Sequence, residues 1–303
     1  MIRVHVNDPL DQEALNLLKS RTQLDVTSEH LEKEKLLELM PQVEVLIVRS
    51  ATKVNREIIE KGTKLRIIGR AGVGLDNIDV VAAKEKGIKV LNTPGASAVS
   101  VAELTFGLML SAARHIARGT KDLKEGLWTK KELEGHELFG RTLGIIGLGM
   151  IGKEVAKRAL AFEMKVLAYD PLVPSFQGVE MVNLDELYKF SDFITLHVPL
   201  NEQTKHMINA EAIEKMKNGV IIVNASRGGV IDEQALYNAL VSGKVYAAAL
   251  DVFEVEPPQD ELRKKLLQLQ NVVATPHIGA STCQAQERVG KELVERILKE
   301  LGI

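Results

Sequence analysis

The sequence predicts an α/β protein made of two domains, each built around a parallel β-sheet. Its 303 residues are enough for about two domains of roughly 150 residues each. Short runs rich in β-branched residues alternate with longer stretches of helical periodicity, which is typical of parallel sheets covered by helices. In the second half, a glycine-rich turn joins an apolar strand to a helix, as in open α/β sheets that bind nucleotides.

The pattern in the first third of the chain predicts one complete α/β unit that ends in a turn. Strands are expected at residues 3–6, 24–27, 43–48, 65–69 and 89–91, and helices at residues 11–19, 32–40, 56–61 and 79–86. Residues 93–96 have turn chemistry, and residues 99–118 are apolar on more than one face. This pattern predicts a linker followed by one long buried helix.

A second strand series follows a loop-like segment that ends near Gly140. Its strands are expected at residues 143–146, 166–169, 193–197, 220–224, 246–250 and 272–275. The last helical stretch, about residues 280–301, has no strand after it. We therefore expect this helix to return to the first domain.

Composition and charge exclude several classes of partner. The 39 Lys and Arg residues nearly balance the 41 Asp and Glu residues, so the chain has no broad positive field for nucleic acid or an anionic membrane surface. No apolar signal segment or membrane span is present. The single cysteine, Cys283, needs no oxidising compartment, so we expect a cytoplasmic protein with neither a nucleic-acid nor a membrane partner.

The turn after residues 143–146 has the spacing G-x-G-x-x-G. Gly147 permits a tight turn, Gly149 lets the backbone approach a pyrophosphate, and Gly152 lets the helix pack closely on the strand. The N-terminus of that helix offers free N–H groups to the anion. The turn therefore predicts a dinucleotide-binding loop.

Asp170 ends the next strand, 21 positions beyond Gly149. A carboxylate near this spacing accepts hydrogen bonds from the adenosine ribose hydroxyls and repels a 2′-phosphate. It therefore favours NAD over NADP. The structural alternative is that Asp170 only caps the turn before Pro171.

Three candidate chemical groups follow neighbouring strands of the second series. Arg227 follows residues 220–224, Glu256 follows the next strand, and His277 follows the last one. Ligand sites in open α/β sheets lie outside the carboxyl ends of the strands, so these side chains are expected at one edge. An enzyme that interconverts an alcohol and a ketone needs an acid/base for the proton and a cation for a substrate carboxylate.

Taken together, these motifs resemble the D-isomer-specific 2-hydroxyacid dehydrogenases over nearly the whole chain, with the strongest likeness to their phosphoglycerate dehydrogenase branch. The matching stretches are residues 48–52, 69–79, 92–94, 101–103, 143–152, 225–229, 251–257 and 275–282. The resemblance implies two Rossmann-like (flavodoxin-like) domains with an active-site cleft between them. It places the substrate domain at residues 1–95 plus 282–303 and the NAD-binding domain at residues 96–281.

The resemblance also implies a role for each catalytic candidate. His277 would exchange the substrate proton, Glu256 would pair with the imidazole, and Arg227 would bind the substrate carboxylate and polarise its C2 oxygen. These roles suit the residue types, because guanidinium is a bidentate donor and a carboxylate fixes the tautomer of an imidazole.

Further contacts are implied for the cofactor and the substrate. The cofactor would contact Gly147, Gly149, Met150, Ile151, Gly152, Asp170, His197, Val198, Ala225, Ser226, Arg227, Asp251, His277, Gly279 and Ala280. The substrate would contact Arg49, Ser50, Gly72, Val73, Gly74 and Asn92 besides Arg227 and His277. For His197 a packing role is an equal alternative.

The resemblance further implies a homodimer formed through an arm at residues 100–140. The apolar side chains of Leu104, Phe106, Leu108, Met109 and Leu110 agree with such a contact, whereas the alternative is a helix buried within its own chain. Within the arm, Lys130 and Lys131 either reach the substrate phosphate of a partner subunit or are solvated surface.

The expected reaction is NAD-dependent oxidation of 3-phospho-D-glycerate to 3-phosphohydroxypyruvate, the entry to serine biosynthesis. The alternatives are a glyoxylate or hydroxypyruvate reductase and, outside enzymes, an NAD-responsive corepressor. Glu256 argues against the formate dehydrogenases of the superfamily, which have glutamine there. The chain ends directly after its closing helix, so the regulatory domain of longer phosphoglycerate dehydrogenases, and serine feedback through it, are expected to be absent.

No catalytic metal is expected. Histidine, aspartate and glutamate residues show no metal-ligand spacing, and a lone cysteine cannot build a thiolate site. The remaining histidines, His5, His30, His115, His136 and His206, have no partner pattern and are expected to be surface or packing residues.

Overall fold

The computed structural model describes all 303 residues and divides the chain into two compact units. The terminal unit comprises Met1–Ser97 and Ala280–Ile303, and the central unit comprises Ala98–Gly279. The sequence predicted the boundaries two residues away, after residues 95 and 281. The differences arise because a helix of the central unit begins at Ala98 and because the Ala280 carbonyl accepts a hydrogen bond from Gln286 of the last helix.

The terminal unit contains a five-stranded parallel sheet. Its strands are β1 (Ile2–Val6), β2 (Leu24–Ser28), β3 (Val45–Val48), β4 (Ile67–Arg70) and β5 (Lys89–Leu91), in the order β2-β1-β3-β4-β5. All four residues of β3 are buried, as expected for a central strand covered on both faces.

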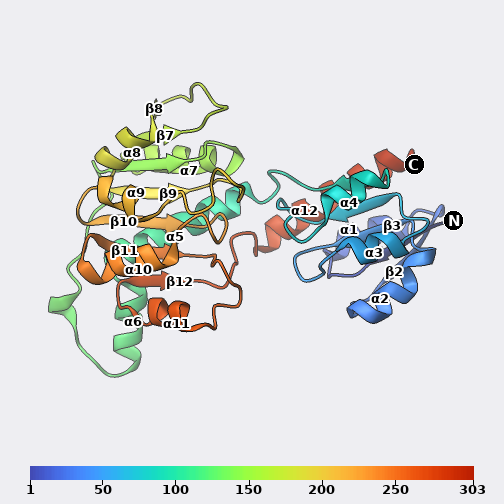
Figure 1. The fold of residues 1–303 in the computed structure, drawn as a ribbon, viewed down its shortest axis with the longest axis horizontal. Coiled ribbons are helices and arrows are strands. Elements are labelled where there is room, and N and C mark those ends of the chain that lie inside the picture. The colour runs from blue at the N-terminus through green and yellow to red at the C-terminus, as the bar shows by residue number, and fades with distance from the viewer. The chain divides into compact units, whose positions relative to one another are not determined.

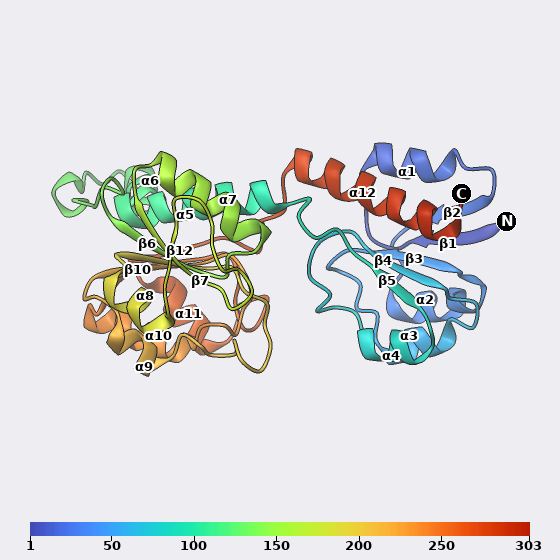
Figure 2. The ribbon, with the colours of Figure 1, turned by 90° about the horizontal axis from the view of Figure 1, so that it is seen from above.

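Helices cover both faces of this sheet (Figure 2). One face carries α1 (Gln12–Lys19) and α12 (Cys283–Leu301), and the other carries α2 (Lys33–Leu39), α3 (Arg56–Lys61) and α4 (Val80–Glu85). The last helix begins at Cys283, because Thr282 Oγ1 accepts the Ala285 N–H at 3.1 Å and caps it. Its buried Leu293 and Ile297 join the core of this unit, and each such side chain contributes about 1.5–3 kcal/mol by burial.

The central unit contains a seven-stranded parallel sheet in the order β12-β11-β10-β9-β6-β7-β8 (Figure 1). The strands are β6 (Thr142–Ile146), β7 (Lys165–Tyr169), β8 (Glu180–Met181), β9 (Phe193–Leu196), β10 (Val220–Asn224), β11 (Val245–Leu250) and β12 (Val272–Ala274). The two-residue strand β8 was not predicted, since it is too short to show periodicity. The strand order reverses at β6, the position where open α/β sheets bind ligands.

Helices again cover both faces, so the prediction of two parallel-sheet domains is confirmed. One face carries α5 (Ala98–Arg114), α6 (Ile116–Lys124) and α7 (Met150–Ala161), and the other carries α8 (Leu184–Phe190), α9 (Ala210–Lys215), α10 (Glu233–Ser242) and α11 (Glu261–Gln268) (Figure 2). No helix in either unit combines the length and the apolar composition needed to cross a membrane.

The expectation of one helix over residues 99–118 is wrong. Helix α5 ends at Arg114. His115 follows with a left-handed φ of 55°, and helix α6 begins at Ile116. His115 Nε2 lies 2.8 Å from the Tyr246 hydroxyl, a long-range contact that periodicity cannot reveal. The segment expected to be a loop also contains a short 3₁₀ helix at Lys130–Glu132.

Candidate active site

The glycine loop follows β6 at the reversal of strand order. A Cβ on Gly147, whose φ is 93°, would lie 2.4 Å from the His197 carbonyl oxygen. A Cβ on Gly152 would lie 2.1 Å from the Gly147 carbonyl oxygen. Both positions therefore require glycine, the first for its left-handed backbone and both for close packing.

The loop has the space and the donors that a dinucleotide needs. A Cβ on Gly149 would meet no atom within 4 Å, so this side of the loop is open. Helix α7 begins at Met150 directly after Gly149, and the N–H groups of a first helical turn have no partner within their helix. These residues fit the pyrophosphate of NAD, which in such a site binds at the helix N-terminus.

Asp170 stands at the end of β7 beside this loop. Its Oδ2 accepts the Leu148 N–H at 2.7 Å, and its Oδ1 accepts the N–H groups of Leu172 and Val173 at 2.8 and 3.2 Å. The carboxylate thus caps the following turn and also ties it to the glycine loop. Each carboxylate oxygen has more than one acceptor direction, so these bonds are compatible with a ribose contact.

His197 lies in the chain segment directly after β9. Its Nε2 lies 3.0 Å from Thr195 Oγ1, its Nδ1 is buried without a hydrogen-bond partner, and burial lowers its pKa to about 3. The ring is therefore neutral at physiological pH. Its carbonyl oxygen is the group that Gly147 approaches, while Val198 is half-buried beside it.

The turn after β10 presents Arg227. Asn224 Oδ1 accepts from the backbone N–H and the hydroxyl of Ser226 at 3.0 and 2.8 Å, and its Nδ2 donates to the Arg227 carbonyl at 2.9 Å. Arg227 Nη1 donates to the Ser226 carbonyl at 2.7 Å. Ala225 and Ser226 are buried under the turn. The Asn224 side chain therefore shapes the backbone that carries the guanidinium.

The turn after β12 presents His277 and is organised by Asp251 of the neighbouring strand end. The buried Asp251 carboxylate accepts hydrogen bonds from Thr275 Oγ1 at 2.6 Å and from the N–H groups of Ile278 and Gly279, both at 2.8 Å. The His277 N–H donates to the Asp251 carbonyl at 2.8 Å, and the residue has a left-handed φ of 53°. Ala280, also expected at the cofactor, begins the second segment of the terminal unit.

Glu256 and His277 form a directed pair. Glu256 Oε2 lies 2.8 Å from His277 Nδ1, and Glu256 Oε1 accepts the Phe253 N–H at 3.1 Å. The carboxylate is held at both oxygens, which fixes the ring and leaves Nε2 as the nitrogen that can exchange a proton.

The pair shifts the pKa of both partners toward the charged forms. The hydrogen bond that His277 donates to Glu256 raises the pKa of His277. Burial lowers this pKa, the charges of Glu256 and Asp251 raise it, and the charge of Arg227 lowers it. Burial raises the pKa of Glu256, but the bonds from His277 and the Phe253 N–H and the charges of His277 and Arg227 lower it overall. Because the two side chains are 49% and 36% exposed, solvent screens part of this coupling.

The turn that carries Arg227 packs closely against the loop that carries Glu256, and Gly228 lies at this contact. A Cβ on Gly228 would lie 1.8 Å from the Phe253 carbonyl oxygen, so only glycine permits this approach. Arg227 also acts electrostatically on both members of the Glu256–His277 pair. The central unit thus brings all three catalytic candidates together at the carboxyl edge of its sheet.

The terminal unit gathers the expected substrate loops at the carboxyl ends of β3, β4 and β5. Asn92 Nδ2 donates to the Val73 carbonyl at 2.6 Å, and the Thr93 N–H donates to the Gly72 carbonyl at 2.9 Å. These bonds fix the loop that contains Gly72, Val73 and Gly74. Ser50 is exposed on the neighbouring loop.

Sequence reasoning missed the residues that hold the Arg49 loop. The buried Asp8 carboxylate accepts the Arg49 and Thr52 N–H groups at 2.6 and 3.1 Å, and Asn77 Nδ2 donates to the Arg49 and Thr52 carbonyls, both at 2.7 Å. The available signal was an aspartate two residues after the first strand, at the same sheet edge as the proposed substrate loops. Asn224 and Thr275, each at the end of a strand, carried the same kind of signal.

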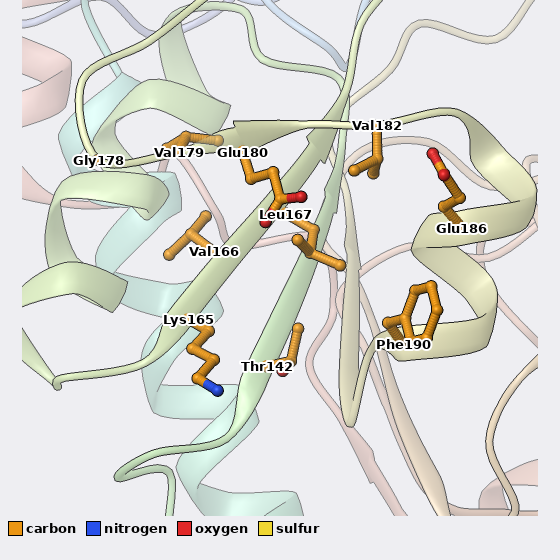
Figure 3. A pocket seen from close by; sticks show the side chains of 10 residues that line it. All are labelled: Thr142, Lys165, Val166, Leu167, Gly178, Val179, Glu180, Val182, Glu186 and Phe190. Atoms are coloured by element: carbon orange, nitrogen blue, oxygen red, sulfur yellow. The ribbon is translucent and has the colours of Figure 1, made fainter.

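A separate pocket of about 630 Å³ lies at the other end of the central sheet (Figure 3). It is lined by Thr142, Lys165, Val166, Leu167, Gly178, Val179, Glu180, Val182, Glu186 and Phe190. Thr142 and Lys165 begin β6 and β7, whereas the glycine loop follows the carboxyl end of β6. The pocket is therefore distinct from the nucleotide loop. No group of three or more His, Cys, Asp or Glu side chains is arranged to hold a metal ion.

Comparison with known proteins identifies the family. Residues 106–279 match the family described as D-isomer specific 2-hydroxyacid dehydrogenase, NAD binding domain. The chain belongs to this family. It is 70% identical to a hydroxypyruvate reductase of Thermotoga maritima over 99% of both chains. It is 54% identical to a D-3-phosphoglycerate dehydrogenase of Methanocaldococcus jannaschii over 99% of this chain, but spans only 58% of that relative's length.

The fold agrees with that of solved members. A D-lactate dehydrogenase from Aquifex aeolicus, complexed with NAD and lactic acid, superposes with a TM-score of 0.87 at 34% identity. The match covers 99% of this chain and 95% of that one. The family prediction is confirmed: the chain is a D-2-hydroxyacid dehydrogenase, its cofactor is NAD, and the central unit is the NAD-binding domain.

We predict that Asp170→Ala weakens NADH binding and relaxes the preference over NADPH. The variant removes an acceptor for the ribose hydroxyls and the charge that repels a 2′-phosphate, so the ratio of kcat/KM for the two cofactors should change by about 10- to 100-fold. Asp170→Asn is the matched control for shape, since it retains one acceptor oxygen and loses the charge. An unchanged ratio in both variants would remove Asp170 from cofactor selection.

We predict that Glu256→Gln moves the alkaline limb of reductive kcat/KM to lower pH. If protonated His277 is the proton donor in reduction, loss of the carboxylate lowers the pKa of this group, so the acid form disappears at lower pH. Oxidation requires the neutral ring and should persist to lower pH than in the wild type. His277→Asn should reduce turnover about 10²- to 10⁴-fold with little change in NADH binding. A wild-type alkaline limb in the Gln variant would contradict the assignment.

Proposed function

We propose that the chain catalyses the NADH-dependent reduction of hydroxypyruvate and related short 2-keto acids. The observation that carries this proposal is the Glu256–His277 pair, set at 2.8 Å beside Arg227, in a chain 70% identical to a hydroxypyruvate reductase over its full length. This shifts the preference away from 3-phospho-D-glycerate, which the sequence motifs alone favoured.

His277, Glu256 and Arg227 would each have a separate role in the proposed reaction. Bound NADH supplies the hydride. Protonated His277 gives the proton from Nε2 to the carbonyl oxygen as it becomes a hydroxyl, while Glu256 stabilises the imidazolium through Nδ1. The Arg227 guanidinium binds the C1 carboxylate and polarises the C2 oxygen, so that negative charge developing there is stabilised.

We propose the following cofactor and substrate contacts. The glycine loop with Met150 and Ile151 would hold the pyrophosphate, Asp170 the ribose, and His197, Val198, Ala225, Ser226, Asp251, Gly279 and Ala280 would line the remainder of the cofactor. Arg49, Ser50, Gly72, Val73, Gly74 and Asn92 would serve substrate recognition.

A second candidate is oxidation of 3-phospho-D-glycerate in serine biosynthesis. It is favoured by the 54% identity to an archaeal phosphoglycerate dehydrogenase and by two exposed lysines, Lys130 and Lys131. Two adjacent ammonium groups suit a phosphate dianion. Under this hypothesis the lysines would reach the substrate phosphate of a partner subunit.

We predict a higher kcat/KM for hydroxypyruvate than for 3-phosphohydroxypyruvate, with NADH as the reductant. Glyoxylate in the same assay shows whether the third carbon matters. The control is the variant Lys130→Ala/Lys131→Ala, which should leave hydroxypyruvate reduction unchanged. A preference for the phosphorylated acid that is lost in this variant and falls with added salt would favour the second candidate.

We also propose that the chain forms a homodimer through the arm at residues 100–140. The apolar side chains of α5 do not support this contact as the sequence suggested, because Phe106, Leu108 and Met109 pack in the core of their own unit. Other apolar side chains of the arm are exposed instead: Ile116, Leu123, Leu127, Trp128 and Phe139. Five exposed apolar side chains within one segment favour a protein contact there.

Sedimentation velocity tests the dimer. The wild-type chain should sediment at twice its chain mass, and Trp128→Glu, which places a charge on the 81%-exposed indole position, should shift it toward the monomer. Val241→Glu is the control, since Val241 is also exposed but lies in α10, outside the arm. A monomeric wild type, or equal effects of both variants, would count against this interface.

A further inference from the structure

An ion-pair cluster with a buried arginine and one buried carboxylate lies beside the loop that carries Glu256. We define this Arg263 cluster as Glu233, Glu254, Asp260 and Arg263. Arg263 is 8% exposed; its Nε lies 2.7 Å from Glu233 Oε2, its Nη1 donates to Asp260 Oδ2 at 2.8 Å, and its Nη2 donates to Glu254 Oε2 at 3.2 Å. One guanidinium therefore joins the start of α10 to the loop before α11.

The cluster fixes the backbone directly before Glu256. The Glu254 N–H donates to Glu233 Oε1 at 2.8 Å, so Glu254 is bound through both its main chain and its side chain. The preceding N–H, that of Phe253, is the donor that holds Glu256 Oε1. The peptide between Phe253 and Glu254 carries the N–H that binds Glu233, and the adjoining peptide, between Val252 and Phe253, carries the N–H that binds Glu256, so the two bonds restrain successive peptides of one loop.

The same loop is also bound to the segment that follows Arg227. His206 Nε2 lies 3.1 Å from Glu254 Oε1, and the His206 N–H donates to the Gly229 carbonyl at 2.8 Å. Gly228 contacts the Phe253 carbonyl. The loop thus has polar anchors on two sides, and neither anchor is a group that acts on the substrate.

Stability alone does not explain a buried arginine at this position. Burying Arg263 and Glu233 removes both charges from water, and an apolar pair of similar volume often packs as well or better. The guanidinium does provide orientation, because Nη1 and Nη2 donate in fixed directions to Asp260 and Glu254, while Glu233 is held by an ion pair to Nε without hydrogen-bond geometry.

We propose that Glu233 and Arg263 are positioning residues that hold residues 253–256 so that the Glu256 carboxylate stays on His277 Nδ1. This inference rests on the proposed acid/base role of His277. The groups that act on His277 are Glu256, Asp251 and Arg227, and those that face Glu254 are Glu233, Arg263 and His206, with Asp260 on the far side of Arg263.

The sign of a pH shift separates positioning from simple electrostatics. Removal of a cation favours a nearby imidazolium, so loss of the Arg263 charge by itself would raise the pKa of His277. Loss of the Glu256 contact lowers that pKa. If Arg263 positions Glu256, its loss should move the alkaline limb of reductive kcat/KM to lower pH. If Arg263 acts only through its charge, its loss should move that limb to higher pH.

The test is the pH profile of reductive kcat/KM for Arg263→Met, with hydroxypyruvate and NADH. We expect the alkaline limb to move to lower pH, as in Glu256→Gln, and kcat to fall about tenfold or more. In the double variant Glu256→Gln/Arg263→Met, the arginine substitution should add no further shift, because the contact it protects is already absent. Arg263→Met alone leaves the buried Glu233 carboxylate without its cation, which could destabilise the fold. The variant Glu233→Gln/Arg263→Met removes both buried charges and should show the same shift of the alkaline limb.

Arg158→Met is the matched control. Arg158 is also an arginine between two carboxylates, Glu154 and Glu103 at 2.8 and 3.2 Å, but it lies on α7 away from the loop, so the limb should not move. An unchanged or raised alkaline limb in Arg263→Met, with a lowered one in Glu256→Gln, would overturn the positioning role and leave the proposed function intact. If Glu256→Gln itself leaves the limb unchanged, the acid/base assignment fails, and the positioning role fails with it.

Discussion

The catalytic edge of the central unit depends on the buried carboxylate of Asp251. A buried carboxylate is costly unless it is hydrogen-bonded, and Asp251 receives three hydrogen bonds from residues 275–279. Bonds to a charged acceptor contribute roughly 1.5–3 kcal/mol each, whereas a left-handed non-glycine residue costs about 1–3 kcal/mol. The bonds therefore outweigh the strain at His277, and the turn can hold an imidazole in a backbone conformation that a free loop would seldom adopt.

The rest of the site follows from how closely the backbones approach. At Gly147 and Gly152 the glycine loop packs against other main-chain carbonyls, and at Gly228 one catalytic turn packs against another. These contacts leave no room for a side chain at the three glycines, so the functional side chains come from positions near these contacts. Arg227 is one residue before Gly228, and Glu256 is three residues after Phe253. Main-chain packing therefore sets where the three side chains enter the edge, and side-chain contacts such as Glu256–His277 then set their orientation.

Sequence patterns predicted the fold well because both sheets are parallel and buried, which gives short apolar strands in regular alternation with helices. The glycine loop and the preference for NAD followed from local spacing, and the family followed from the resemblance of a series of motifs to known members. Features that depend on distant partners were missed: the break at His115 depends on Tyr246, and the anchor of the Arg49 loop depends on Asp8. The ion pair between Arg263 and Glu233 has no local signal in the sequence, because the two residues are 30 positions apart.

The same physical argument explains why catalytic geometry and substrate choice are separate questions. Hydroxypyruvate, glyoxylate and 3-phosphohydroxypyruvate share a C1 carboxylate and a C2 carbonyl, and Arg227 and His277 suit only these groups. Hydroxypyruvate and 3-phosphohydroxypyruvate differ in charge at the third carbon, so discrimination between these two must come from charge near that carbon, which a chain with net charge −2 can supply only locally. At Arg49 the backbone N–H is fixed by Asp8 at 2.6 Å, while the guanidinium has a long 3.4 Å bond to the Pro9 carbonyl. If Arg49 meets the substrate as proposed, a loosely held guanidinium on a fixed backbone would suit a carboxylate or a phosphate, and the number of further cations at the substrate would then set any preference for a phosphate.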